Sequence, residues 1–318
     1  MEAVKKTGLA VLAVMLTGAM ANAQKFPEKP VEMTVLFGGS AQAVGQVLAD
    51  QMSKALGKPV VAVSRPGGGG AIGYTYVKSQ PADGYNIVWN SNSISTVHHQ
   101  GNVPFDYKAF TPIARIGMEV PVLAVRKDSG WSSLKDMIDA SKKGNTKLRV
   151  AVGGNGSFTH IVSTALMKKL GTDAVYVPGG TGREVAELLG GRVDAVLRFP
   201  SEVKSHVDAG TLVVLCTATR EKYDVGLKAP TCDEAGAKGF EMSMWRGLAA
   251  PAGTPPAVVA KLQAAAKTAV ESAEFKKAAG NLGFTTAFLP AKEFGEVIRS
   301  DDKEIGALMK EIGSKKKQ

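Results

Sequence analysis

Short apolar runs alternate with stretches of helical spacing along most of the chain. The first runs are Val31–Phe37 and Val60–Val63, with the helical pattern Val44–Leu56 between them. Apolar runs without polar alternation are typical of strands buried on both faces of a sheet. The sequence therefore predicts βαβ units, and its fold class is α/β.

The same alternation continues through the chain before it gives way to helices. Further strands are expected at Asn86–Trp89, Pro121–Val125, Leu148–Val152, Ala174–Val177, Asp194–Leu197 and Leu212–Cys216. Helices are expected at Ala71–Ser79, Ser133–Lys142, Thr159–Leu170, Gly182–Leu189, Pro255–Ala279 and Pro290–Lys310.

The N-terminus has the pattern of a secretory signal peptide. Lys5 and Lys6 precede the apolar segment Leu9–Met20, and Ala21-Asn22-Ala23 follows as an A-x-A cleavage site. We expect residues 1–23 to be removed and the mature protein to be periplasmic. An uncleaved N-terminal membrane anchor is the alternative, although the apolar segment is short for a bilayer span.

Composition narrows the possible partners. The 318 residues carry a net charge of +10, and loss of Lys5, Lys6 and Glu2 with the leader leaves +9. In an exported protein such a charge favours anionic solutes. Aromatic residues do not interleave with basic ones, so no nucleic-acid partner is expected.

The chain contains two cysteines, Cys216 and Cys232. In an oxidising compartment they can form a disulfide. Alternatively, Cys216 is a small buried hydrophobe within its apolar run. Neither has nearby histidine ligands, so no metal site is expected.

The glycine-rich segment Gly67–Gly73 invites a comparison with phosphate-binding loops. A nucleoside-triphosphate loop needs Lys and Ser or Thr directly after its last glycine, but Tyr74 and Thr75 stand there. A dinucleotide fold needs an acidic residue about 20 positions on, and Asp83 comes too early. The segment is therefore interpreted as a turn that leads into a short helix, and no cofactor is expected.

Four polar junctions fall where predicted strands end and helices begin. Ligands of open α/β sheets bind at such strand ends, beside the positive N-termini of helices. The junctions are Phe37–Gln42, Asn90–Ser93, Gly153–His160 and Pro178–Gly182. Together they predict a cleft that holds a carboxylate.

Several motifs, in their order and spacing, resemble the periplasmic receptors of tripartite tricarboxylate transporters, the Bug family. The similarity extends from about Pro27 to Asp301. The motifs are Arg65-Pro66-Gly67 with Gly70 and Ile72-Gly73, Pro81-Ala82-Asp83-Gly84-Tyr85, Pro104-Phe105-Asp106-Tyr107, Phe110-Thr111-Pro112-Ile113, Gly154-Asn155-Gly156-Ser157 with His160, Gly190-Gly191 with Val193-Asp194, and Trp245 with Gly247-Leu248 and Ala250–Pro255.

This resemblance implies a type II periplasmic binding protein with two α/β lobes and a hinge of crossing strands. Lobe 1 would comprise residues 24–125 and 247–318, and lobe 2 residues 126–246. The protein would bind a small carboxylate as a monomer, pass it to membrane permease subunits and catalyse nothing. Trp245 would lie where the chain recrosses between the lobes.

The sequence departs from the family pattern at positions that are expected to affect which ligand is bound. Gln42 replaces an acidic residue, which argues against an amino-acid ligand, and Gly179-Gly180 replaces Tyr-Lys and leaves more room. Arg198 stands where the family has Asp or Asn, so it can grip a second carboxylate. An ion pair within the protein is the alternative for Arg198.

The ligand is thus expected to be a di- or polycarboxylate. Phe37 and Phe158 could sandwich a flat one such as a phthalate isomer, while His160 either contacts the ligand or orients its loop. The expected ligand-binding residues are Phe37, Ser40, Ala41, Gln42, Ser91, Asn92, Asn155, Ser157, Phe158, His160, Thr181 and Arg198.

Two other functions are weighed against this one. An exported carboxylate sensor that acts through a signalling partner would have the same sequence features. An exported hydrolase or lyase would need an activated nucleophile, and the chain has no G-x-S-x-G elbow.

Overall fold

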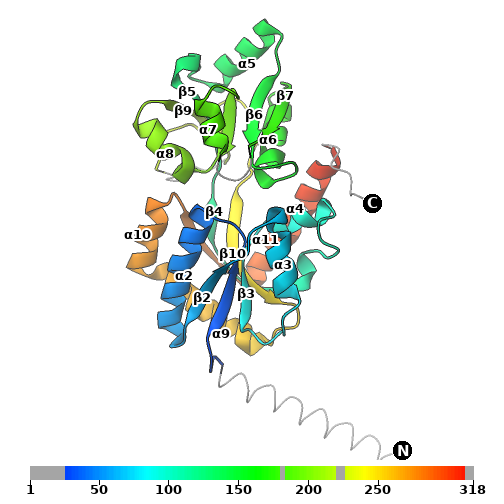
Figure 1. The fold of residues 1–318 in the computed structure, drawn as a ribbon, viewed down its shortest axis with the longest axis vertical. Coiled ribbons are helices and arrows are strands. Elements are labelled where there is room, and N and C mark those ends of the chain that lie inside the picture. Colours follow the sequence, from blue (N-terminus) through cyan, green and yellow to red (C-terminus); the bar gives the residue numbers. More distant parts are fainter. Residues whose placement is uncertain (1–25, 180–182, 220–225, 312–318) are drawn as a thin grey trace, which may run out of the picture.

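The computed structural model describes residues 26–179, 183–219 and 226–311, which form two α/β lobes (Figure 1). The predicted fold class is confirmed. The predicted leader lies outside the described residues. Within the described ranges, no helix combines the length and the apolar character that a bilayer span requires.

The elements keep the order of the prediction, with additions. The strands are β1 (Val31–Val35), β2 (Val60–Ser64), β3 (Asn86–Ser91), β4 (Phe110–Glu119), β5 (Val122–Arg126), β6 (Leu148–Val152), β7 (Ala174–Pro178), β8 (Ala195–Arg198), β9 (Leu212–Thr217), β10 (Met244–Pro251) and β11 (Thr285–Pro290). The helices are α2 (Ser40–Leu56), α3 (Ala71–Lys78), α4 (Ser93–His99), α5 (Leu134–Gly144), α6 (Phe158–Lys169), α7 (Glu184–Leu189), α8 (Pro200–Asp208), α9 (Pro256–Glu271), α10 (Ala273–Asn281) and α11 (Ala291–Glu311).

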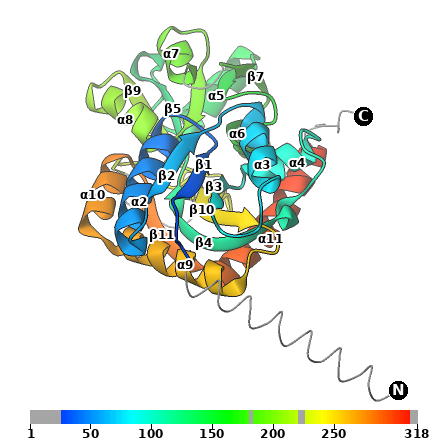
Figure 2. The ribbon, with the colours of Figure 1, turned by 60° about the horizontal axis from the view of Figure 1, so that its bottom comes forward.

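Lobe 1 is built on a six-stranded sheet in the order β11-β4-β10-β3-β1-β2. Strands β1, β2 and β3 are parallel, whereas β10 is antiparallel to both β3 and β4. Figure 2 shows α2 and α9 near the sheet, where buried side chains such as Leu48 and Leu262 form one apolar core. The apolar stripe of α2 therefore anchors the helix whose N-terminus points to the interlobe boundary.

Lobe 2 is built on a five-stranded sheet in the order β7-β6-β8-β5-β9. Strand β6 is parallel to β7 and β8, and β5 is antiparallel to β8 and β9. Its core joins Leu123, Val150 and Leu197 to Phe158 and Leu166 of α6. The loop after β6 faces lobe 1, where Gln100 Nε2 donates to the carbonyl of Asn155.

The chain passes between the lobes at β4–β5 and again at β10. Strand β4 ends at Glu119 in the first sheet, and β5 begins at Val122 in the second. The expected boundary at residue 125 had placed this strand in lobe 1. Trp245 lies at the start of β10, paired with Met118, which is the place expected for it.

Apolar patterning did not reveal β4, β10, β11, α4 or α8. Strand β4 contains Pro112, Arg115 and Gly117, and its pairing with β10 and β11 is interrupted by register shifts. A Cβ at Gly247 of β10 would lie 2.6 Å from the carbonyl oxygen of Ala114. These strands are thus packed too closely and too irregularly to show a regular apolar pattern.

The glycine-rich segment forms the predicted turn before a short helix. Gly67, Gly68, Gly69 and Gly70 all have positive φ, from 57° to 126°, and α3 begins directly afterwards. Residues with a Cβ rarely adopt this conformation, which accounts for the run of glycines.

The C-terminal helix α11 connects the lobes on one side. Ile305 and Met309 of α11 form a buried apolar cluster with Ile161 of α6. Lobe 1 therefore reaches lobe 2 through this helix as well as through the crossing strands (Figure 1).

The two cysteines form a disulfide, so this alternative is confirmed. Cys216 and Cys232 are both fully buried and lie 16 residues apart in the chain. The bond ties the end of β9 to the segment that leads toward β10.

Replacing both cysteines by alanine should lower the free energy of unfolding by about 3 kcal/mol, because the bond closes a short loop in the unfolded chain. Urea unfolding of the double variant and of the wild type, each with and without reductant, measures this difference. The wild type unfolded under reductant should approach the variant. Equal stability of the two oxidised proteins would contradict the expectation.

Candidate ligand-binding site

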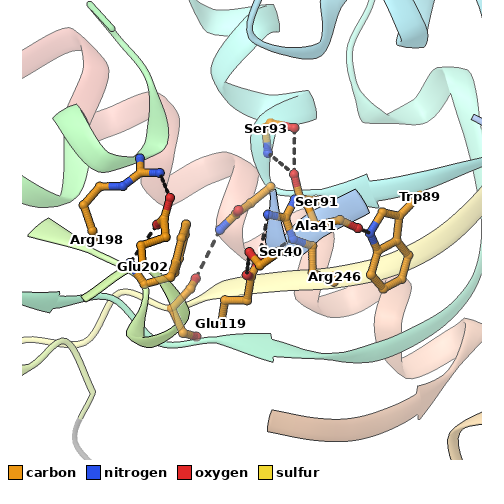
Figure 3. A network of polar contacts seen from close by, with 12 residues as sticks. Ser40, Ala41, Trp89, Ser91, Ser93, Glu119, Arg198, Glu202 and Arg246 are labelled. Atoms are coloured by element: carbon orange, nitrogen blue, oxygen red, sulfur yellow. Dashed lines mark hydrogen bonds and ion pairs between the residues drawn. The ribbon is translucent and has the colours of Figure 1, made fainter. Parts of the chain in front are cut away.

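The loops that follow β1, β3, β6 and β8 gather at the boundary between the lobes. Direct contacts cross this boundary, since Asn92 Nδ2 donates to the carbonyl of Ser243 at 3.2 Å and Gln100 Nε2 to that of Asn155 at 3.4 Å. The second predicted junction thus contacts the lobe 2 side of the boundary through Asn92, and the third contacts lobe 1 through Asn155. In Figure 3, Ser40 of the first junction lies near Ser91 of the second, across from Arg198 of lobe 2. The fourth junction, Pro178–Gly182, follows β7 and lies partly outside the described residues.

On the lobe 1 side, α2 begins without a capping side chain. Its N-cap is Gly39 with φ of 65°, and its first turn has no acidic residue. Glycine has no side chain that could cap the helix, and Oγ of Ser40, the first helical residue, donates to Glu119 Oε1 at 2.9 Å. The first amide groups of α2 therefore present their partial positive charge without a protein anion in the first turn.

Glu119 and Arg246 form a buried ion pair beside this helix. Arg246 Nε and Nη2 each lie 2.6 Å from Glu119 Oε2, and both side chains are at most 4% exposed. The guanidinium lies 5.6 Å from the centre of the half-buried Phe37 ring. Arg246 Nη1 is buried and has no hydrogen-bond partner among the residues that the structure describes.

The β3–α4 junction is an internally bonded polar network. Ser91 Oγ lies 2.7 Å from Ser93 Oγ, and Tyr74 Oη donates to Asn90 Oδ1 at 2.7 Å. Burial raises the pKa of Tyr74 to about 12, so its hydroxyl stays protonated. Ser91 is completely buried and therefore supports the loop from beneath.

On the lobe 2 side, His160 holds the loop before α6. Its Nδ1 accepts a 2.8 Å hydrogen bond from the amide of Gly156, and its ring packs on Tyr176. Burial lowers the pKa of His160, so the imidazole is neutral and keeps Nδ1 as an acceptor. Ser157 caps α6 by accepting from the amide of His160. The structure thus shows His160 orienting its loop.

Arg198 ends β8 and is bound by carboxylates of its own lobe. Its Nη1 lies 3.2 Å from Glu184 Oε1, and its Nη2 contacts Glu202. The side chain of Arg198 is 10% exposed and that of Glu202 is 27% exposed. Two carboxylates therefore face one guanidinium. The ion-pair alternative for Arg198 is present, and a ligand contact stays a prediction.

The remaining expected residues differ in position. Phe37 and Ser40 lie next to Glu119 and Arg246, whereas Gln42 is exposed with its Oε1 near Gly38, and Ala41 is buried, with its carbonyl bonded to Trp89. Asn155 is exposed on the lobe 2 loop, and Phe158 is buried in the lobe 2 core. Thr181 lies outside the described residues.

A cavity of about 260 Å³ lies between the lobes at the start of β10. Asn92 and Phe158 contribute to its wall, together with Trp245 and Asp301. Trp245 Nε1 donates to Asp301 Oδ2 at 2.7 Å, and burial raises the pKa of Asp301 to about 6. Phe158 therefore lines this cavity, and no contact places it beside Phe37.

Sequence reasoning missed Glu119, Arg246, Glu184 and Asp301. The first two had a detectable signal, since each interrupts an apolar stretch: Glu119 between Met118 and Val120, and Arg246 after Trp245. A charge at such a position is expected to have a buried partner. Across the described ranges, no group of His, Cys, Asp and Glu could hold a metal ion.

Comparison with known proteins assigns the class. The family model for the tripartite tricarboxylate transporter family receptor matches residues 44–314. A protein of Agrobacterium vitis encoded in the TAR-I ttuE-ttuC' intergenic region is 31% identical over 278 residues, covering 82% of this chain and 78% of the relative. BugT of Bordetella pertussis is 27% identical over 320 residues, covering 97% and 98%.

Solved structures agree with this fold. The periplasmic binding protein BugD superposes with a TM-score of 0.79 at 28% identity, covering 92% of this chain and 100% of BugD. MatC from Rhodopseudomonas palustris, determined with bound malate, gives a TM-score of 0.77 at 25% identity, covering 89% and 99%.

The two-lobed fold and the loops that meet between the lobes define a solute-binding receptor, which is not an enzyme. The chain belongs to the tripartite tricarboxylate transporter receptor family, which includes the Bug proteins. The resemblance found in the sequence is confirmed.

Asp301→Asn should stabilise the protein near pH 7.5 and stabilise it clearly less near pH 4. A carboxyl whose pKa rises from 3.8 to about 6 on folding favours the folded state when protonated. The unfavourable contribution of the ionised form thus grows as the pH rises from about 4 to about 6, to roughly 3 kcal/mol. Thermal unfolding at both pH values measures it, with the exposed Glu296→Gln on the same helix as control. An equal shift at both pH values would contradict this account.

Proposed function

We propose that this protein is a periplasmic receptor that binds a small di- or polycarboxylate and delivers it to the membrane permease of a tripartite transporter. The family supports the class of receptor. The transport partner and the export route through a cleaved leader belong to the same proposal.

The uncapped N-terminus of α2 is the observation that carries the carboxylate assignment. Its amide groups are oriented at the boundary between the lobes, and Ser40 is turned away to Glu119. A helix N-terminus of this kind attracts an anion through its free donors and its partial charge. A ligand carboxylate would complete the first turn.

The structurally similar protein MatC supports a ligand of this size. Its structure contains malate, which is a dicarboxylate, and it shares the two-lobed fold with this chain. In our proposal, the first carboxylate of the ligand binds at α2. The second reaches Arg198 of lobe 2 and competes there with the partly exposed Glu202.

An aromatic ligand such as a phthalate isomer is a narrower form of the proposal. Phe37 offers one half-buried ring at the site. Phe158 is packed in the lobe 2 core, so a flat ligand would stack on one aromatic face.

A thermal-shift series on the mature protein tests the function. A ligand that binds only the folded state raises the Tm. At a ligand concentration of 100 times its Kd, the folded state is stabilised by about 2.7 kcal/mol. The series compares malate, succinate, citrate and the phthalate isomers with acetate and benzoate, and glucose and ethanolamine serve as controls. Stabilisation by the controls without any by carboxylates would refute the proposal.

Arg198→Ala should weaken the binding of a dicarboxylate on the order of 100-fold, and it should change the binding of a matched monocarboxylate far less. The reason is that only the second carboxylate is expected at Arg198. Calorimetric titration of both ligands separates this effect from a general repulsion by Glu184 and Glu202, which would weaken both. Unchanged dicarboxylate affinity would remove Arg198 from the site.

A further inference from the structure

The Glu119–Arg246 pair has a hydrogen-bonding capacity that the protein does not use. Both side chains are almost fully buried, and Glu119 accepts from Ser40 as well as from Arg246. Arg246 Nη1 has no acceptor within the described residues, although it is inaccessible to solvent. A buried charged donor without a partner is costly, which indicates that an acceptor is missing.

The position of Arg246 indicates which acceptor is missing. Its guanidinium lies beside Phe37, and its partner Glu119 accepts a hydrogen bond from Ser40. The loop between β1 and α2 therefore meets the Glu119–Arg246 ion pair where α2 begins (Figure 3). An anion bound at the first turn of α2 would lie next to Nη1. A carboxylate accepts strongly from both backbone amides and a guanidinium.

Charge balance distinguishes this arginine from Arg198. Arg198 Nε also has no partner in the described part of the chain, but two carboxylates contact that guanidinium. Arg246 faces one carboxylate, so the pair is neutral and the adjacent helix terminus adds positive potential. Of the two buried arginines, Arg246 lies in the environment that favours an anion.

We propose that Arg246 is a specificity-determining residue that donates through Nη1 to the ligand's carboxylate, and that Glu119 is the buried counter-charge with which the ligand competes for the guanidinium. This inference rests on the proposed function. The half-buried Phe37 ring covers the guanidinium, so the ligand reaches Nη1 when this ring moves aside.

The double variant of the pair and the single variant of Glu119 should have opposite effects on carboxylate affinity. The double variant Glu119→Gln/Arg246→Gln removes both charges together and should lose about 10- to 100-fold in affinity for the carboxylate that stabilises the wild type best. Glu119→Gln alone leaves Arg246 buried without a counter-charge. It should lower the Tm of the unliganded protein and tighten carboxylate binding several-fold, because the ligand then supplies that charge.

Calorimetric titration and thermal unfolding of each variant provide the test. The matched control is Arg149→Gln/Asp194→Asn, which removes another arginine–carboxylate pair, formed within lobe 2 at 2.6 Å. This control should bind within about twofold of the wild type, because its pair lies outside the proposed site.

Full carboxylate affinity in the folded double variant would overturn the inference and leave the proposed function intact. Unchanged or weaker binding by Glu119→Gln would also overturn it, because a purely structural pair gives no gain. A wild type that binds no carboxylate in the series would refute the proposed function and this inference together. If the double variant does not fold, Arg246→Lys keeps the charge and removes the guanidinium, and the same loss of at least tenfold is expected.

Discussion

The antiparallel pairing of β4 with β10 is the constraint on which the rest of the structure depends. These strands carry the chain between the lobes and are neighbours in the interior of the lobe 1 sheet, between β11 and β3. Their packing is tight enough to require glycine at position 247, where a Cβ would meet the Ala114 carbonyl and the Phe294 ring. The pairing of β4 with β10 therefore determines where both lobes lie, and with them the loops that form the candidate site.

The crossing strands also bring charge into the interior. Glu119 and Arg246 face each other across β4 and β10 beside the N-terminus of α2. On the other face of β10, Trp245 binds Asp301 of α11, whose pKa is raised by burial. Two adjacent residues of β10 thus contribute to two different places at the interlobe boundary. Arg246 lies at the candidate carboxylate site, and Trp245 lines the cavity near α11. A buried ion pair contributes little net stability, so its position at a ligand site is more readily explained by recognition.

Much of the site is held by bonds within the protein. Ser91, Ser93 and Tyr74 satisfy one another beneath the β3 loop, and His160 fixes the Gly156 amide in the β6 loop. Such side chains keep the loops in place, which leaves backbone amides and a few buried donors to contact a ligand. Receptors of one fold can therefore differ in specificity through residues such as Arg246 that stand behind the loops.

The sequence by itself determined the α/β class, the order of most elements, the receptor family and the junctions at which the site lies. These depend on local patterns: apolar runs, turn glycines and motifs with fixed spacing. Only the tertiary structure decided which charges meet. The sequence left open whether Arg198 pairs within the protein, and the structure pairs it with Glu184 and Glu202. Glu119 and Arg246, 127 positions apart, form a pair that no local pattern specifies. The physical reason is that the pairing of an ionised side chain is set by long-range strand register and burial, and sequence spacing contains neither.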